Sequence, residues 1–430
     1  MDELKYLKRL SLIKSGKNLK FLTPAAYPGG HCPMWTCNTM TERIKNLSSL
    51  LIGMPECATY SRTFTSRPEG ENGELHWLYV LDENEVVFGC REGVISALKE
   101  MENAGATSIL MIATCVTDLI GEDFEGLINE AASELNANLA FVTVGQFRNF
   151  SYQIGAWKTM EAIGSMMEDR TLDPGTVNAL LVDPFAIEGE ETELPVIVSE
   201  LEKKGIKVRK LVPGASLEDY MSASDASLNL VLCSYMQPLA ELMKREYGIE
   251  YIPLHTAFSI EQTDSAYAKI ALHLGIEWDD EFTESRNEAV KLEEAAKKRL
   301  NELSYVFLRR VDMPVPLAAY LAKFGMKPEL IHVEDFHPED PIYAKELKEY
   351  GFDPPACRMM NFDVDIQTIK RLGVDLCFGR MDEQIEGIRC VEEMGDYFGT
   401  VGYERVSSLI SRIFEVLDTG KIGGKKYGIV

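Results

Sequence analysis

The sequence predicts an α/β protein made of three doubly wound, Rossmann-like domains with parallel sheets. Apolar runs of strand length alternate with segments whose apolar residues recur at helical spacing, which is the pattern of successive βαβ units. The strand-like runs are nearly all apolar, as parallel strands buried on both faces are. The pattern restarts twice along 430 residues, a length too great for one hydrophobic core. We therefore place the domains at residues 1–165, 166–285 and 286–430.

The first domain shows the alternation most clearly. Apolar residues in the segment 94–101 have helical spacing, and this helix is expected to end before Gly105. The apolar run TSILMIATC (107–115) follows as a strand. A second amphipathic helix over 124–135 leads to the next strand, ANLAFVTV (137–144). Two strands joined by a helix of this length are expected to lie parallel.

The other two domains repeat this order. The second has a predicted helix at 191–204 and predicted strands at 178–185, 206–213, 228–233 and 250–254. The third follows a charged helix at 288–303, and its predicted strands lie at 304–310, 330–336 and 374–379. Each restart therefore predicts a further parallel sheet.

Charge and composition narrow the classes of partner. The net charge of −24 argues against nucleic acid or an anionic membrane as the main partner. It favours a partner with a basic docking face, although a merely solvated acidic surface explains it equally well. No run of about 18 apolar residues predicts a membrane span. Neither a GxxxxGK[ST] phosphate loop nor a strand–GxGxxG–helix fingerprint is present, so ATP hydrolysis or NAD binding by those devices is not expected.

The cysteine content points to a reduced compartment. Nine cysteines in 430 residues are too few for a disulfide scaffold, and residues 1–21 do not have the pattern of a signal peptide. We therefore expect a cytoplasmic protein, in which grouped thiols bind metal or act in catalysis.

Three cysteines stand out because they lie on separate loops. Cys32 is in PGGHCPMWTC, Cys57 is in LLIGMPECATYSR, and Cys115 ends a predicted strand. Open α/β sheets bind ligands at the carboxyl ends of their strands. Thiols presented there suit a soft metal, above all an iron–sulfur cluster. The alternative is that all three are buried cysteines that act as small hydrophobic residues.

Several segments, in the same order, resemble a subunit of nitrogenase component 1, the iron–sulfur protein that receives electrons from an ATP-driven reductase. LLIGMPECATYSR resembles the family's glycine-rich loop, and DENEVVFGCREGV resembles its strand and helix start. TCVTDLIGEDFEGLI resembles the Cys…IGDD…I segment, and GQFRNFSYQIGAW resembles the F-R-x-x-S-x-x-x-G segment. VLCSYMQPLAELMKREYGIEYIPL resembles a helix that begins with cysteine and ends in YGIP. The resemblance covers nearly the whole chain, and the first 160 residues match best.

The resemblance implies an iron–sulfur cluster, of 4Fe–4S size or larger, at the interface of two subunits. Three cysteines of each subunit hold it in this family, and Cys32, Cys57 and Cys115 match their positions. Cys37 competes with Cys32 for the first position. Gly53 matches a site where the backbone approaches the cluster closely.

Two further residues are placed near this cluster by the resemblance. Ser151 matches a serine beside the interface cluster in some members, and its alternative role is a helix N-cap. Arg62 can offset the thiolate charge or simply pair with a surface carboxylate.

A second site is implied around Cys233, which matches the cysteine that binds the catalytic metal cofactor of nitrogenases. The family's second ligand is a histidine, and Phe398 stands at its place here. Phenylalanine does not bind metal, so a second metal cofactor near Cys233 needs another ligand, or the cavity holds an organic substrate. The alternative for Cys233 is a core thiol at a strand end. His255, at the end of a predicted strand, is a candidate proton donor.

These features together predict a nitrogenase-like reductase subunit. It would accept electrons from a separate ATP-dependent iron–sulfur reductase and reduce a substrate or cofactor in a cleft between its domains. Three thiols leave a four-iron cluster one ligand short, so a second component-1-type subunit, identical or homologous, is expected. The alternatives are a non-enzymatic scaffold for metal-cofactor assembly, a tetrapyrrole or sulfur-compound reductase of the same family, and a redox-inert supporting subunit.

Overall fold

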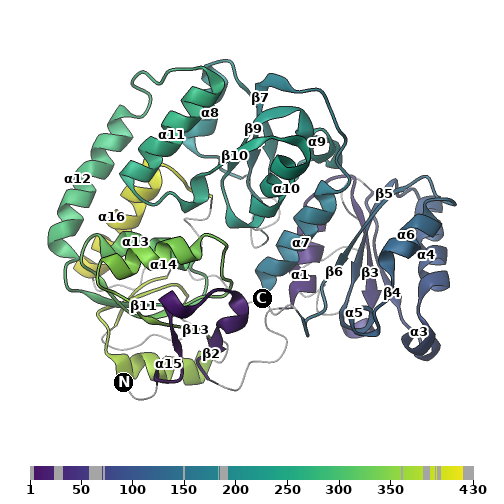
Figure 1. Ribbon diagram of the computed structural model, residues 1–430, viewed down its shortest axis with the longest axis horizontal. Helices are drawn as coiled ribbons and strands as arrows, with labels where there is room; N and C mark the ends of the chain where they lie inside the picture. Colours follow the sequence, from purple (N-terminus) through teal and green to yellow (C-terminus); the bar gives the residue numbers. More distant parts are fainter. Residues whose placement is uncertain are drawn as a thin grey trace. The chain divides into compact units, whose positions relative to one another are not determined.

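The computed structural model contains three β-sheets flanked by helices (Figure 1). It describes residues 4–23, 32–57, 70, 73–148, 151–182, 184, 192–359, 362–380, 388–392, 394 and 399–419. The chain separates into two compact units, one formed by residues 1–30, 194–197 and 253–430 and the other by residues 31–193 and 198–252. The predicted division into three domains near residues 165 and 285 stays a prediction. No helix in the described part of the chain is long and apolar enough to cross a membrane.

The first sheet has the strand order β4-β3-β5-β6, and all of its pairs are parallel. Its strands are β3 (Ser48–Gly53), β4 (His76–Val80), β5 (Ser108–Ala113) and β6 (Asn138–Thr143). The predicted strands 107–115 and 137–144 correspond to β5 and β6. β3 and β5 are buried at every position, as expected of central parallel strands.

Helices cover both faces of this sheet (Figure 1). α4 (Arg91–Asn103) and α6 (Phe124–Ala131) pack on one face, where Val94, Leu98 and Leu127 form a core with alternate residues of β3 and β5. α1 (Pro33–Glu42) and α7 (Tyr152–Gly164) cover the other face. Two short helices, α3 (Glu83–Phe88) and α5 (Cys115–Ile120), follow β4 and β5 directly.

The second sheet has the strand order β10-β9-β7-β8, with β7 paired in parallel to β8 and β9. Its strands are β7 (Asp173–Leu180), β8 (Lys207–Leu211), β9 (Ala226–Val231) and β10 (Glu250–Pro253), and its helices are α8 (Val196–Lys203), α9 (Leu217–Met221) and α10 (Gln237–Tyr247). The short 3-10 helices η4 (Ala223–Asp225) and η5 (Ser234–Met236) flank β9.

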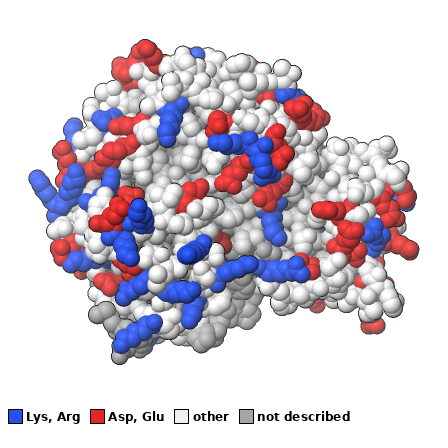
Figure 2. All heavy atoms as spheres, in the orientation of Figure 1, with Lys and Arg blue, Asp and Glu red and all other residues white. Residues whose placement is uncertain are grey.

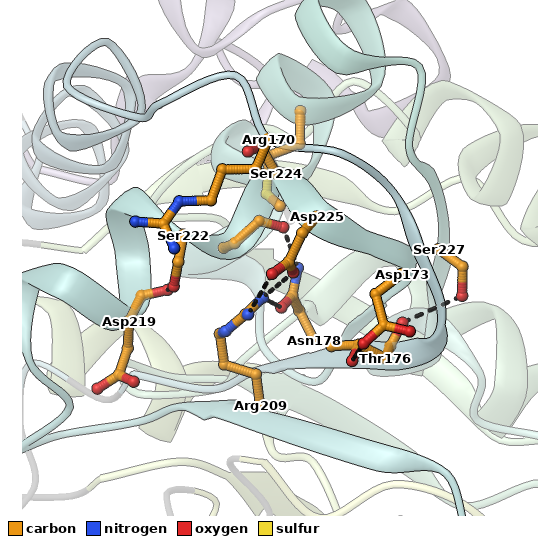
Figure 3. A network of polar contacts seen from close by, with 12 residues as sticks. Arg170, Asp173, Thr176, Asn178, Arg209, Asp219, Ser222, Ser224, Asp225 and Ser227 are labelled. Carbon is orange, nitrogen blue, oxygen red and sulfur yellow. Dashed lines mark hydrogen bonds and ion pairs between the residues drawn. The ribbon is translucent and has the colours of Figure 1, made fainter.

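A buried polar network ties the strands of this second sheet together (Figure 3). Arg209 forms a two-pronged ion pair with Asp225, at 2.7 and 2.9 Å, and donates to Asn178 Oδ1 at 3.1 Å. Asn178 in turn donates to Asn229, its direct neighbour on β9, at 2.8 Å. The network therefore links β7, β8 and β9 through their side chains in addition to the backbone pairing.

The third sheet has the path β1-β13-β12-β11-β14-β15, and β2 also pairs with β13. Its parallel strands are β11 (Ser304–Phe307), β12 (Lys327–His332), β13 (Pro355–Arg358), β14 (Leu376–Phe378) and β15 (Arg389–Val391). The order runs outward in both directions from β11, which is the doubly wound arrangement that the sequence predicts. Two short N-terminal strands extend this sheet, β1 (Lys8–Arg9), which is antiparallel, and β2 (Lys20–Phe21), which is parallel.

The remaining helices belong to the same compact unit as the third sheet. They are α11 (Ile260–Leu274), α12 (Thr283–Arg299), α13 (Pro314–Ala322), α14 (Asp340–Glu349), α15 (Phe362–Leu372) and α16 (Tyr403–Thr419), with the 3-10 helices η2 (Leu10–Leu12), η3 (Gly16–Asn18) and η6 (Leu254–Thr256). The whole is an α/β protein with three parallel sheets, as predicted.

Candidate metal centre

The carboxyl edge of the first sheet carries two of the three predicted metal ligands. Cys57 follows β3, and Cys115 is the first residue of α5, two residues after the end of β5. The third, Cys32, is the N-cap residue of α1, which packs against β3 and β5. All three thiols are free and partly exposed, whereas the other six cysteines are buried.

Cys57 lies next to the start of α5, since its Sγ is 3.9 Å from Oγ1 of Thr114, the residue before Cys115. The pKa of Cys32 is raised to about 11, chiefly by burial, and the negative charges of Cys115 and Cys57 raise it further. The backbone N–H groups of Met34 and Trp35, in the first turn of α1, oppose this shift. Without a cation, Cys32 is therefore a neutral thiol at neutral pH. Binding of a metal would replace its proton, which is the usual linkage between thiolate ligation and pH.

Gly53, the last residue of β3, lies against this group. A Cβ atom at Gly53 would lie 2.3 Å from Thr114 Oγ1 and 3.3 Å from Cys57 Sγ. Thr114 is held in place because its hydroxyl donates to Ile52 O at 2.8 Å. The backbone of Gly53 therefore passes next to the Cys57 thiol in a space that admits no side chain.

A backbone donor that the sequence analysis missed contacts Cys115. The N–H of Gln146 donates to Cys115 Sγ at 3.2 Å. Gln146 comes shortly after β6, so the loop after a third strand also contributes to this edge. The signal available in the sequence was its place just beyond the predicted strand 137–144. Such N–H donors stabilise negative charge on a ligating sulfur.

Ser151 has the role that the sequence analysis gave as its alternative. It is fully buried and is the N-cap residue of α7, where its hydroxyl accepts the N–H of Ile154 at 3.2 Å. Arg62, predicted to offset thiolate charge, lies outside the described residues, as does Phe398.

Cys37 occupies a different environment from Cys32. Its side chain is fully buried between α1 and α7, where Sγ accepts a hydrogen bond from Thr159 Oγ1 at 3.0 Å and donates to Gly155 O at 3.3 Å. Burial raises the pKa of this thiol to about 12. These contacts make Cys37 part of the helix–helix packing.

Cys233 and His255, the predicted catalytic residues, are both fully buried and belong to different compact units. Cys233 follows β9, and its Sγ lies 3.6 Å from Val182 O, within hydrogen-bonding range for a thiol donor. The next residue, Ser234, accepts a hydrogen bond from Trp157 Nε1 of α7 at 2.9 Å. His255 lies in η6, where its carbonyl accepts from Arg405 Nη1 at 2.6 Å.

The donor set fits a cluster better than a single metal ion. Among the described residues, no group of three or more His, Cys, Asp or Glu side chains is arranged around a single ion. An iron–sulfur cluster distributes its thiolates over several irons, so its ligands stand further apart than those of one ion. Three neighbouring thiols, an N–H donor to one sulfur and a close glycine backbone fit a cluster.

Exposed apolar side chains lie on the segments that follow three strands of this sheet. Val87 and Phe88 of α3 are 70% and 85% exposed, Leu119 of α5 is 58% exposed, and Phe147 after β6 is 75% exposed. We call these four residues the apolar face. Because α3 and α5 are in contact, these residues stand on adjacent segments, and contiguous exposed apolar surface is typical of interaction sites.

Relatives with known names resemble this chain over part or most of its length. It is 28% identical over 222 residues to the nitrogenase iron-molybdenum cofactor biosynthesis protein NifE of Nostoc sp., a match that covers 50% of this chain and 44% of the relative. The NifE protein of Clostridium pasteurianum is also 28% identical, over 52% of this chain and 48% of its own. The matches therefore span about half the length of these relatives. The nitrogenase molybdenum-iron protein alpha chain of Methanothermobacter thermautotrophicus is 24% identical over 79% of this chain and 76% of its own.

A solved structure supports the fold, and a family model identifies the family. The structure of nitrogenase Cp1 at pH 6.5 superposes with a TM-score of 0.72 at 19% identity, over 95% of this chain and 97% of that one. This likeness concerns the fold alone. The model of the nitrogenase component 1 type oxidoreductases matches residues 32–418, so the chain belongs to that family.

Proposed function

We propose that this protein is the iron–sulfur subunit of a nitrogenase-like reductase, in which Cys32, Cys57 and Cys115 hold a cluster shared with a second subunit. The observation that carries the proposal is a set of three partly exposed thiols, two of them at the carboxyl edge of a parallel sheet, with the Gln146 N–H on Cys115 and the Gly53 backbone beside Cys57. When bound, the cluster would supply electron transfer. The chain's own residues orient the sulfurs and stabilise their charge.

Each ligand has a distinct support in the chain. Cys32 is the N-cap residue of α1, a position that favours negative charge because the backbone N–H groups there are unsatisfied by the helix. Cys115 receives the Gln146 N–H. Cys57 lies beside Gly53, whose missing side chain leaves room at its sulfur. Three thiols leave a four-iron cluster one ligand short, so a second component-1-type subunit would complete it.

The electron donor in this proposal is a separate ATP-dependent reductase that docks on the apolar face. Acidic side chains lie beside that face, including Glu83 and Glu85 of α3 and Asp123 next to α6. Figure 2 shows Asp and Glu side chains gathered on the part of the molecule that carries these helices. An apolar centre with an acidic surround fits a partner with an apolar patch and a basic rim, because complementary charge speeds encounter.

Iron and acid-labile sulfide per chain, with electron paramagnetic resonance on anaerobically purified protein, test the cluster. We expect several irons with matching sulfide and a signal on reduction. Cys57→Ala and Cys115→Ala should each lose the iron while circular dichroism shows a folded chain. The matched control is Cys37→Ala, which should keep its iron. Unchanged iron in both ligand variants would rule out this ligand assignment.

A second candidate function is a scaffold that holds a metal-cofactor precursor during assembly. Two observations favour it: Phe398 stands in the sequence where the family has a histidine as second cofactor ligand, and relatives such as the Nostoc protein are named for cofactor biosynthesis. A scaffold must release its cargo, and a site with one fewer ligand releases it more readily. Cys233 would then bind the metal-cofactor precursor, and His255 would have no catalytic role.

Iron labelling distinguishes the two functions. A scaffold transfers labelled iron to a cofactor-free acceptor and takes up no electrons from a reductase with ATP. A reductase subunit keeps its iron and is reduced in an ATP-dependent manner. Cys233→Ala should abolish the transfer in the first case and spare the reduction of the cluster in the second.

A further inference from the structure

The loop after β6 brings the Gln146 N–H to Cys115. Val144 N donates to Ala113 O at 2.9 Å, so the pairing of β6 with β5 continues one residue past the strand. The chain then makes a turn, closed by a hydrogen bond from Arg148 N to Gly145 O at 3.2 Å. We call residues 145–148 the Gln146 turn. The position of this turn decides whether the N–H reaches the sulfur.

The Asp118 side chain of α5 packs against Gly145, the first residue of this turn. It is one helical turn after Cys115, so both side chains project from the same side of the helix. Asp118 is 8% exposed, and a Cβ atom at Gly145 would lie 2.2 Å from its Oδ2 and 2.8 Å from its Cβ. Only glycine fits there unless Asp118 moves, so the contact sets the distance between the turn and α5.

Arg148, the last residue of the turn, reaches back to the same aspartate. Its Nε lies 3.5 Å from Asp118 Oδ2, and its Nη2 donates to Asp118 O at 3.4 Å. The Arg148 side chain is 65% exposed, so solvent weakens this pair. The ion pair therefore orients the turn, while the Gly145 contact determines how closely it packs.

We infer that Asp118, Gly145 and Arg148 act as a clamp that holds the Gln146 N–H on Cys115 Sγ and thereby tunes the reduction potential of the group bound there. The inference rests on the proposed function, because it assigns Cys115 as a ligand. An N–H donor to a ligating sulfur favours the more negative, reduced state. Loosening the clamp therefore lowers the potential without removing a ligand. All three are positioning residues, since they act through Gln146.

Hydrogen exchange and redox titration on the full chain, purified anaerobically with its partner subunit, test this inference. Gly145→Ala displaces the turn without changing any charge, and Arg148→Gln releases its other end. Arg148→Lys keeps the positive charge but loses the planar set of guanidinium N–H donors. The matched control is Arg91→Gln, which removes one arginine charge from the same sheet domain, where Arg91 pairs with Glu130 on the surface at 3.1 Å.

We expect amide exchange at Gln146 to accelerate about tenfold or more in Gly145→Ala and Arg148→Gln. The midpoint potential should fall in both, and a tenfold loss of preference for the reduced form corresponds to about 59 mV for a one-electron couple. Arg148→Lys should resemble Arg148→Gln, since a single ammonium group cannot hold both the Asp118 carboxylate and the Asp118 carbonyl as the guanidinium does. Arg91→Gln should match the wild type in both measurements.

The outcomes separate the inference from the proposed function. Iron-loaded variants with wild-type exchange and potential would overturn the clamp and leave the cluster assignment intact. A wild-type protein without iron would overturn the proposed function, and with it the tuning role of the clamp. Should Gly145→Ala fail to fold, Arg148→Gln carries the test, because its substitution lies at an exposed position.

Discussion

Thr159 of α7 donates a hydrogen bond to Cys37 Sγ of α1 at 3.0 Å. The same hydroxyl lies 2.8 Å from Gly155 O of its own helix, so its single hydrogen is shared between the two acceptors. Cys37 is fully buried there, while Cys32, five residues earlier on the same segment, is partly exposed beside two other thiols. Two neighbouring cysteines therefore have different tasks, one in packing and one at the candidate metal centre.

Substitution of each cysteine should separate these tasks. Cys37→Ala should lower the free energy of unfolding by about 1 to 2 kcal/mol, because it leaves a small cavity and removes a buried hydrogen bond. Its iron content should stay at the wild-type level. Cys32→Ala should lose iron and leave the metal-free chain about as stable. Denaturant unfolding and iron analysis of both variants check this, and iron loss in Cys37→Ala alone would reverse the assignment.

Gly53→Ala should damage the candidate site by steric contact alone. The new methyl group would meet Thr114 Oγ1 and Cys57 Sγ, so the loop carrying Cys57 must move. We expect a loss of about 2 kcal/mol in stability and less iron per chain. Gly175→Ala is the matched control, because its Cβ would meet only Asp173 Oδ1, at 3.5 Å, an ordinary contact. Thermal melts and iron analysis give the comparison, and equal results for the two variants would contradict the prediction.

Arg209→Met should destabilise the second sheet. The Arg209 and Asp225 side chains are only 10% and 20% exposed, so removing the guanidinium leaves a largely buried carboxylate and an amide oxygen of Asn178 without their donor (Figure 3). We expect a loss of about 2 to 3 kcal/mol in the free energy of unfolding, measured with denaturant. Arg170→Met, which breaks exposed pairs with Glu168 and Glu218, should change stability much less. A similar loss in both variants would mean that the network adds nothing specific.

His337 should make the protein less stable in mild acid. Its imidazole, 3% exposed after β12, has a pKa lowered to about 4 by burial, against about 6.5 in the unfolded chain. Between these values the unfolded chain binds a proton that the folded protein excludes, so stability falls as the pH is lowered. The contribution from pH 7.5 to pH 5 is about 2 kcal/mol. His337→Gln should lose this part of the pH dependence, and denaturant unfolding at both pH values measures it. The matched control is His273→Gln, on the exposed side of α11, which should keep the wild-type change of unfolding free energy with pH. The same change with pH in His337→Gln as in the wild type would refute the prediction.

The helix α3 shows how local signals compete. The segment DENEVVFGCREGV resembled the family's strand and helix start. In the structure the segment begins with a helix. The Asp82 side chain accepts the first backbone N–H groups of this helix, and the Glu85 carboxylate accepts the N–H of Asp82 at 2.9 Å. This capping box was legible in the sequence as Asp followed three residues later by Glu. The structure therefore corrects the strand expectation at this point.

The N-terminal strands show what local patterns cannot reveal. β1 and β2 have two residues each, too short for any periodicity, and both pair with β13, more than 330 residues away in the chain. Nothing in residues 1–21 indicates a partner at such a distance. Long-range pairing of this kind depends on where the third sheet leaves an open edge.

The sequence by itself determined the alternation of strands and helices and the place of Cys115 after a buried strand, because periodicity is a property of neighbouring residues. It left the choice between Cys32 and Cys37 open and gave no sign of the Gln146 N–H. Only the tertiary structure shows that Cys37 is buried and Cys32 partly exposed, and where the Gln146 N–H lies. α7 covers Cys37 and leaves Cys32 beside the other thiols, and the contact of Gly145 with Asp118 directs the Gln146 N–H to Cys115. Both depend on packing between elements that are distant in the chain, which no local pattern encodes.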